Sequence, residues 1–139
     1  MSMSRYDQVQ VGDTLPSLQV PRITRTTLAL FAGASGDHNP VHIDLDFAKG
    51  AGMPDVFAHG MLSMAHLGRF LTHWMPQSHL RYYAVRFSAI TPVGARLSCQ
   101  GKVVEKLERN GEKLVRLEIG VADDKGEVKL TGEALIALT

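Results

Sequence analysis

The segment from Gly60 to Met75 constrains the fold of this chain more than any other stretch. Proline cannot continue a helix, so Pro76 sets the end of the segment. Its apolar side chains occupy most of the circumference of a helix: Met61, Leu62, Met64, Ala65, Leu67, Phe70, Leu71, Trp74 and Met75. A helix that is apolar on nearly every side is normally buried, so we expect this helix to lie inside the domain.

After this helix the sequence changes to a period of two residues. Apolar and polar side chains alternate over four segments: 82–87, 97–103, 115–121 and 128–138. Asn110-Gly111 is a typical hairpin turn, and consecutive hairpins with period two indicate an antiparallel sheet with one buried face. Because that face must be covered, and the 60–75 helix is the only element long and apolar enough, we predict an α+β hot-dog fold. In this fold an antiparallel sheet wraps around one long central helix.

The residues before the long helix are predicted to form smaller elements. Val9 and Val11 alternate with polar neighbours, which indicates a short strand, and helices are expected over 24–33 and 44–49. A chain of 139 residues fits one domain, spanning residues 1–139. The open edge of the predicted sheet favours pairing with a second copy, so we expect a homodimer or a higher homo-oligomer, with a heterodimer as the alternative.

Composition excludes several kinds of partner. The net charge is only +1 and no basic stripe is visible, so nucleic acid is not expected as a partner. Cys99 is the single cysteine, which rules out an internal disulfide and suits a reducing cytoplasm. The apolar segment 60–75 is shorter than the roughly 20 residues of a membrane span, and residues 1–13 lack the pattern of a signal peptide. We therefore expect a cytoplasmic protein without membrane contact.

The loop between the predicted helices contains a carboxylate and an imidazole. Asp37 lies five residues before His42, on a turn that Asn39-Pro40 favours. Such a pair, placed around one water molecule, can add water to an activated double bond or remove it, with typical contributions of about 10²–10⁴-fold in rate. A turn-capping role for Asp37 and a packing role for His42 remain open, because these residue types are common in turns. Asn39 is expected to fix the loop by hydrogen bonds to neighbouring backbone groups, and contact with substrate is the second possibility.

Gly60 starts the long helix and is the candidate donor to a developing oxyanion. The first N–H groups of a helix have no intrahelical partner and carry partial positive charge, and glycine leaves them accessible. A thioester carbonyl placed there would meet such a donor, whose loss costs about 10²–10³ in rate. Gly60 could instead be a small residue at a crowded helix start. Phe57, His59 and Met61 are, with Asn39, the candidate substrate-binding residues, although packing is the favoured role of His59.

Histidines also raise the question of a metal site. His38, His42, His59 and His66 are close in sequence, but their spacing matches no strong zinc pattern. The only cysteine lies far from them along the chain. We therefore expect no metal ligands and no metal cofactor.

Two motifs resemble a known family. The stretch SGDHNPVHIDLDFA (35–48), followed by AHGMLSMA (58–65), resembles the MaoC-like family of (R)-specific enoyl-thioester hydratases and (3R)-hydroxyacyl dehydratases. The resemblance implies that Asp37 and His42 form a water-activating dyad and that the Gly60 amide is the oxyanion donor. It also implies the hot-dog fold with pockets near a dimer interface. Some relatives have a serine on the central helix where Gly68 stands here.

The resemblance implies a reaction as well. It is the reversible hydration of trans-2-enoyl thioesters to (3R)-3-hydroxyacyl thioesters, in fatty acid or related acyl metabolism. Coenzyme A is the favoured carrier and enters only as part of the substrate, with acyl carrier protein as the alternative; no redox cofactor is expected. Two other functions stay open: a non-catalytic partner subunit of a heteromeric dehydratase, and a hot-dog acyl-CoA thioesterase.

Overall fold

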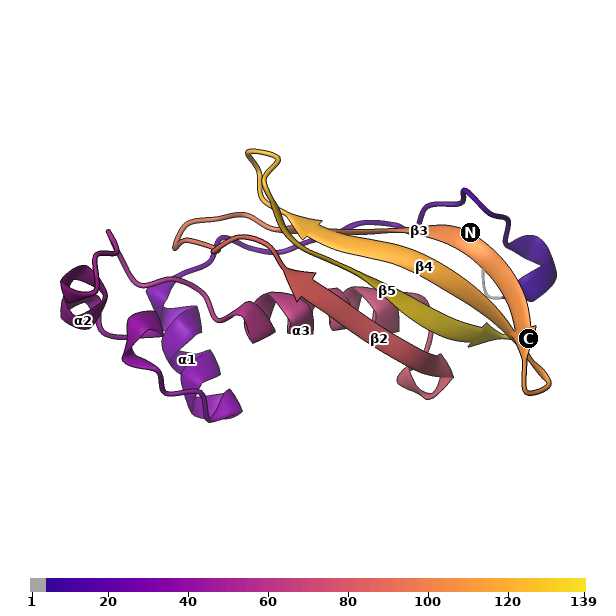
Figure 1. The fold of residues 1–139 in the computed structure, drawn as a ribbon, viewed down its shortest axis with the longest axis horizontal. Coiled ribbons are helices and arrows are strands. Elements are labelled where there is room, and N and C mark those ends of the chain that lie inside the picture. The colour runs from indigo at the N-terminus through magenta and orange to yellow at the C-terminus, as the bar shows by residue number, and fades with distance from the viewer. Residues whose placement is uncertain (1–4) are drawn as a thin grey trace.

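A curved antiparallel sheet wraps around one long helix (Figure 1). The computed structural model describes residues 5–139. Its helices and turns are η1 (Tyr6–Gln8), α1 (Arg25–Ser35), η2 (Pro40–His42), α2 (Leu45–Gly50), α3 (Gly60–Trp74) and η3 (Gln77–His79). Its strands are β1 (Leu18–Gln19), β2 (Leu80–Phe87), β3 (Ser98–Arg109), β4 (Glu112–Ala122) and β5 (Val128–Leu138). All neighbouring strands are antiparallel in the order β1-β3-β4-β5-β2, so the predicted α+β hot-dog fold is confirmed.

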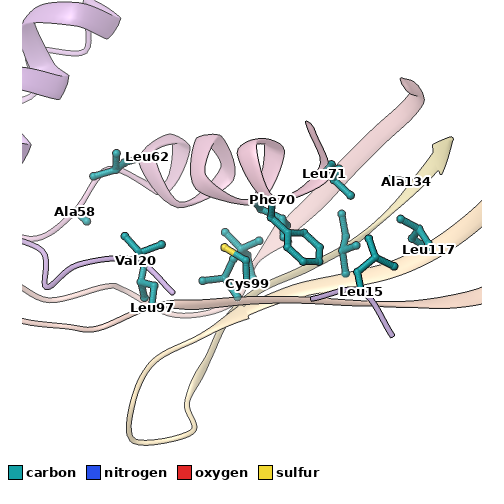
Figure 2. Packing of buried hydrophobic residues seen from close by; sticks show 14 of the residues in the cluster. Leu15, Val20, Ala58, Leu62, Phe70, Leu71, Leu97, Cys99, Leu117 and Ala134 are labelled. Carbon is teal, nitrogen blue, oxygen red and sulfur yellow. The ribbon is translucent and has the colours of Figure 1, made fainter. Parts of the chain in front are cut away.

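The core lies between α3 and the inner face of the sheet. The Phe70 ring points from α3 toward the sheet, where Cys99 of β3 belongs to the same hydrophobic cluster (Figure 2). Gly101 on β3 makes room for this packing, because a Cβ there would lie 3.0 Å from Cε1 of Phe70. The odd-numbered positions of segments 97–103 and 115–121, which the sequence assigns to the buried face, are buried: Leu97, Cys99, Gly101, Val103, Val115, Leu117, Ile119 and Val121.

The prediction that α3 is buried on nearly every side is wrong for the single chain. The sheet covers one side of α3, and Met61, Ala65 and Arg69 on the other side are exposed. Met61 retains 55% of its accessible surface. One five-stranded sheet is too small to enclose the whole helix, and α1 and α2 lie beyond the end where α3 begins (Figure 1). Among residues 5–139, no helix has the length and hydrophobicity needed to cross a membrane.

The prediction of a strand at Val9 and Val11 is also wrong. The first strand is β1, which pairs with β3 through Leu18 opposite Cys99. A turn occupies the predicted position, because the Gln10 N–H donates to the Asp13 carboxylate at 2.9 Å and Gly12 has φ of +99°. Val9 is fully buried in the hydrophobic core while Val11 is 61% exposed, so the alternation reflects one buried side chain and not strand pairing.

Two capped helices hold the loop that precedes α3. Thr24 caps α1 by accepting from the Thr27 N–H at 3.1 Å, as the sequence predicts. Gly36, with φ of +78°, ends α1 in the left-handed conformation, and its N–H donates to the Ala32 carbonyl. Asp44 caps α2 through the Phe47 N–H at 3.2 Å. Residues 36–44 are therefore fixed at both ends.

Gly132 on β5 leads to a stability prediction. It pairs with Val85 on β2, and a Cβ there would overlap the Ala84 carbonyl oxygen and lie 2.9 Å from the Val85 Cα. Backbone cannot move aside as a flexible side chain does, so Gly132→Ala is expected to lower the free energy of unfolding by about 3 kcal/mol. Urea denaturation measures this change. Gly33→Ala in α1 is the matched control, because no atom lies within 4 Å of its new Cβ, and a gain of about 0.5–1 kcal/mol is expected. Equal stability of Gly132→Ala and the wild type would contradict the strand contact.

Candidate active site

The loop that carries Asp37 and His42 is shaped by its own side chains. The Asp37 carboxylate accepts from the Asn39 N–H at 3.2 Å, and the Asn39 side-chain oxygen accepts from the Val41 N–H at 3.1 Å. Pro40 follows as the first residue of η2, where its fixed φ suits the turn. These two consecutive turns place Asp37 on the exposed side of the loop and bring His42 to the inner side, where it is only 9% exposed. The Asn39 side chain is thus used within the loop.

The His42 ring is held in one orientation. Its Nδ1 lies 2.7 Å from the Phe57 carbonyl oxygen, and the Phe57 ring contacts it edge-on at 5.1 Å between centroids. A carbonyl oxygen only accepts hydrogen bonds, so Nδ1 carries the proton of the neutral ring. The lone pair of His42 therefore lies on Nε2, which is the form that a base needs.

His59 connects both members of the dyad to the start of α3. Its ring stacks on His42 with centroids 4.0 Å apart and planes 28° apart, and its Nε2 donates to the Asp37 carbonyl oxygen at 3.2 Å. The Phe31 ring packs edge-on against it at 4.9 Å. His59 is 1% exposed, and burial lowers its pKa, which favours the neutral ring next to His42. His59 packs against His42 and is not among the residues that line the cavity described below.

Asp37, His42 and His59 converge in space. One carboxylate oxygen and one nitrogen from each ring all lie within 4.8 Å of one another. One water molecule can bridge groups separated by this distance, since each hydrogen bond spans about 2.8 Å. The lone pairs of the two stacked rings lie in planes only 28° apart, so this arrangement suits a shared water better than a cation bound by both rings.

A cavity of about 370 Å³ opens beside the dyad. Its wall includes His42 and Phe57, the first turn of α3 with Gly60, and the segment 87–91 that follows β2. A helix N-terminus therefore meets the same space as the imidazole, and Gly60 contributes no side chain to obstruct it. A larger hollow of about 540 Å³ lies over the outer face of the sheet, but none of the residues with candidate chemistry lines it, so we assign the site to the smaller cavity.

The segment 87–91 of the cavity wall depends on a buried lysine that the sequence does not predict as a site residue. Lys129 is 2% exposed, and its Nζ donates to the Ile90 carbonyl at 2.9 Å and pairs with Glu127 at 2.5 Å and Asp123 at 3.4 Å. The Thr91 carbonyl in turn accepts from the Ala58 N–H at 2.8 Å, just before α3. These bonds therefore hold residues 90–91 against the residue that precedes His59 and the start of α3. In the sequence, Asp123 and Glu127 flank a turn, and Lys129 lies two residues after Glu127, on the same side of a strand.

The structure distributes the predicted site residues unevenly. His42, Phe57 and Gly60 line the cavity. Asp37 does not line it, although its carboxylate lies within 4.8 Å of a ring nitrogen of His42. Asn39 and Met61 are exposed and lie outside the cavity wall, and His59 is buried behind it. Ser63 also lines the cavity, and the sequence does not predict it as a site residue.

Comparisons with known proteins agree with this geometry. The chain is 30% identical to the R-hydratase PhaJ1 from Pseudomonas aeruginosa, whose structure superposes with a TM-score of 0.84 over 97% of this chain and 86% of that one. It is 35% identical over 89 residues to 3-hydroxyacyl-thioester dehydratase Z of Mycobacterium tuberculosis, covering 59% of this chain and 58% of that protein. It is also 31% identical over 132 residues to the fatty acid synthase subunit beta of Saccharomyces cerevisiae, covering 93% of this chain but only 6% of that much longer protein.

The family model described as MaoC like domain matches residues 8–125. That range contains the loop with Asp37 and His42, all of α3, and the segment 87–91. Because the match spans most of the chain and includes the residues that converge at the cavity, the protein belongs to the MaoC-like domain family.

Proposed function

We propose that the protein catalyses the reversible hydration of trans-2-enoyl thioesters to (3R)-3-hydroxyacyl thioesters. One observation carries this proposal: the Asp37 carboxylate and the His42 imidazole lie within 4.8 Å, beside a cavity that the N-terminus of α3 also enters. The likeness to an R-hydratase at 30% identity supports the (3R) product. We favour coenzyme A as the carrier, with acyl carrier protein as the alternative.

The proposed mechanism uses three groups. A water molecule held between Asp37 and His42 loses a proton to the dyad as its oxygen bonds to C3 and the C2=C3 π bond breaks. The electron pair moves onto the thioester oxygen, and the Gly60 N–H stabilises the resulting enolate. The dyad then returns a proton to C2, so the net change is the addition of one water molecule across the double bond. Dehydration follows the same steps in reverse.

Crotonyl-CoA is the test substrate. The purified chain is expected to remove the ultraviolet absorbance of the conjugated double bond, and an (R)-specific 3-hydroxyacyl dehydrogenase is expected to oxidise the product. Release of free thiol without loss of the double bond would identify a thioesterase instead. Hydratase activity that appears only after a second protein is added would identify a partner subunit.

We further propose that no metal takes part. The chemistry above needs only the dyad and a backbone amide, and the stacked His42 and His59 rings do not converge on one cation. Dialysis against EDTA is therefore expected to leave the hydration rate unchanged. The measurement is the rate with crotonyl-CoA before and after dialysis. A loss of rate that added Zn²⁺ restores would show that the site is a metal centre.

We also propose a homodimer that forms through β2. This strand is at the edge of the sheet, and Tyr82 and Phe87 on it are 46% and 52% exposed. An unpaired apolar edge favours pairing with a second copy. Sedimentation equilibrium is expected to give a dimer for the wild type and a shift toward monomer for Tyr82→Lys. Leu30→Lys, which adds the same charge to an exposed apolar position on α1, is expected to leave the dimer intact. A wild-type monomer at all concentrations would contradict this proposal, and a larger species would indicate a higher homo-oligomer.

A further inference from the structure

Ser63 is a buried hydroxyl without a protein partner. It lies near the start of α3, one turn after Gly60, and is 2% exposed. Over residues 5–139 its Oγ has no hydrogen-bond partner. A serine inside a helix normally bonds to the carbonyl one turn earlier or faces water. Ser63 does neither, and buried hydroxyls that lack a partner are uncommon because their desolvation is not compensated.

The hydroxyl faces the proposed site. Ser63 lines the same cavity as His42 and Gly60. In an α-helix, residues three apart lie on one face, and each Cα–Cβ bond tilts toward the N-terminus. The side chain of Ser63 therefore covers the turn that begins with Gly60, whose own position has no side chain. The hydroxyl and the Gly60 amide thus open toward the same part of the cavity.

We propose that the Ser63 hydroxyl is a second hydrogen-bond donor to the thioester carbonyl oxygen, beside the Gly60 N–H. This inference rests on the proposed hydration reaction. The carbonyl oxygen gains negative charge as the enolate forms, so both donors bind it more strongly in the transition state than in the bound substrate. No covalent bond to Ser63 forms or breaks, and its proton remains on Oγ throughout. Bound substrate then supplies the partner that the free protein lacks.

The chain offers a matched control. Ser88 also lines this cavity, but its hydroxyl already donates to the Val128 carbonyl at 3.2 Å. Ser63→Ala and Ser88→Ala each remove one hydroxyl from the same cavity wall. Only the first removes a hydroxyl that is free to bind substrate.

Kinetics with crotonyl-CoA give the first readout. Ser63→Ala is expected to lower kcat by about 10²-fold with little change in KM, because the lost interaction is made mainly in the transition state. The pH profile of kcat is expected to keep its shape, since Asp37 and His42 are unchanged. Ser63→Cys replaces the hydroxyl with a slightly larger thiol, which is only a weak donor. Its kcat is expected to fall as in the alanine variant, and it replaces that variant in the test if Ser63→Ala does not fold.

Polarisation of the carbonyl gives the second readout. Hexadienoyl-CoA bound to the Asp37→Asn variant is expected to show a red-shifted absorbance, because donors to the carbonyl oxygen polarise the conjugated system. Adding Ser63→Ala to that variant is expected to reduce the red shift, and adding Ser88→Ala is expected to leave it in place. This readout does not depend on turnover.

Each outcome is decisive. A lower kcat together with a smaller red shift supports the proposal. An active wild type with an unchanged Ser63→Ala variant overturns the role of Ser63 and leaves the hydratase function standing. A lower kcat with an unchanged red shift also overturns it, because the hydroxyl would then act away from the carbonyl. A wild type that does not hydrate enoyl thioesters overturns the proposed function and the role of Ser63 with it.

Discussion

Asp37→Asn and His42→Gln are each expected to lower kcat for hydration of crotonyl-CoA by about 10²–10⁴-fold. Asparagine keeps the shape of Asp37 and its acceptor for the Asn39 N–H, but loses the negative charge. Glutamine can still donate to the Phe57 carbonyl that holds Nδ1 of His42, but it has no basic nitrogen. Both substitutions thus remove proton-transfer chemistry while keeping local hydrogen bonds. Steady-state kinetics measure the loss, and urea denaturation confirms that each variant is folded.

Neighbouring residues of the same type provide the controls. His38, next to Asp37, is an exposed imidazole that lies outside the converging cluster, and Asp46 is an exposed carboxylate on α2. His38→Gln and Asp46→Asn are expected to retain wild-type kcat. Folded Asp37→Asn and His42→Gln variants with wild-type rates would remove the dyad from the mechanism. Equal losses in the control variants would instead indicate a general effect on the loop.

Local patterns in the sequence predict most of the fold. The strands β3 and β4 follow from alternation over 97–103 and 115–121 and from the turn at Asn110-Gly111, where the structure has positive φ at both residues. The start of α3 at Gly60 and its end before Pro76 follow from chain signals that act within one turn. These features are predictable because the residues that determine them lie close together in sequence.

The remaining features depend on contacts between distant segments. The exposure of Met61 depends on how far the sheet curves around α3, which no local pattern specifies. The real first strand is only two residues long and exists because β3 supplies its partner. Lys129 reads as an ordinary strand residue until the Ile90 carbonyl and two carboxylates surround it. Propensity within one segment carries no information about such partners.

The candidate site divides in the same way. The motif brings out Asp37 and His42 because both lie on one short loop whose turns are set by Asn39 and Pro40. The sequence does not show that His59, from the end of another segment, stacks on His42 and bonds to the Asp37 backbone. This stacking fixes the orientation of the dyad relative to α3. The chemistry is therefore visible in the loop, whereas its alignment with the helix N-terminus depends on tertiary packing.

Gly60→Pro is expected to lower kcat by about 10²–10³-fold relative to Gly60→Ala, because proline removes the N–H that the mechanism assigns to the enolate oxygen. Proline is well tolerated at the first position of a helix, where the N–H has no intrahelical partner. The preceding residue also permits it, since His59 has φ of −58° and ψ of 133°, which is the extended conformation that proline requires before it. The helix is therefore expected to form in both variants.

The alanine variant is the necessary reference for this comparison. Any Cβ at position 60 lies 3.0 Å from Cδ1 and Cε1 of Phe87, so alanine and proline both require that ring to shift. The cost of this shift is common to the two variants. The ratio of their kcat values with crotonyl-CoA then cancels the shared contact with Phe87 and reports the replacement of the N–H by the proline Cδ. Equal kcat values in the two folded variants would show that the Gly60 N–H does not stabilise the transition state, and the oxyanion donor would have to be sought elsewhere on the cavity wall.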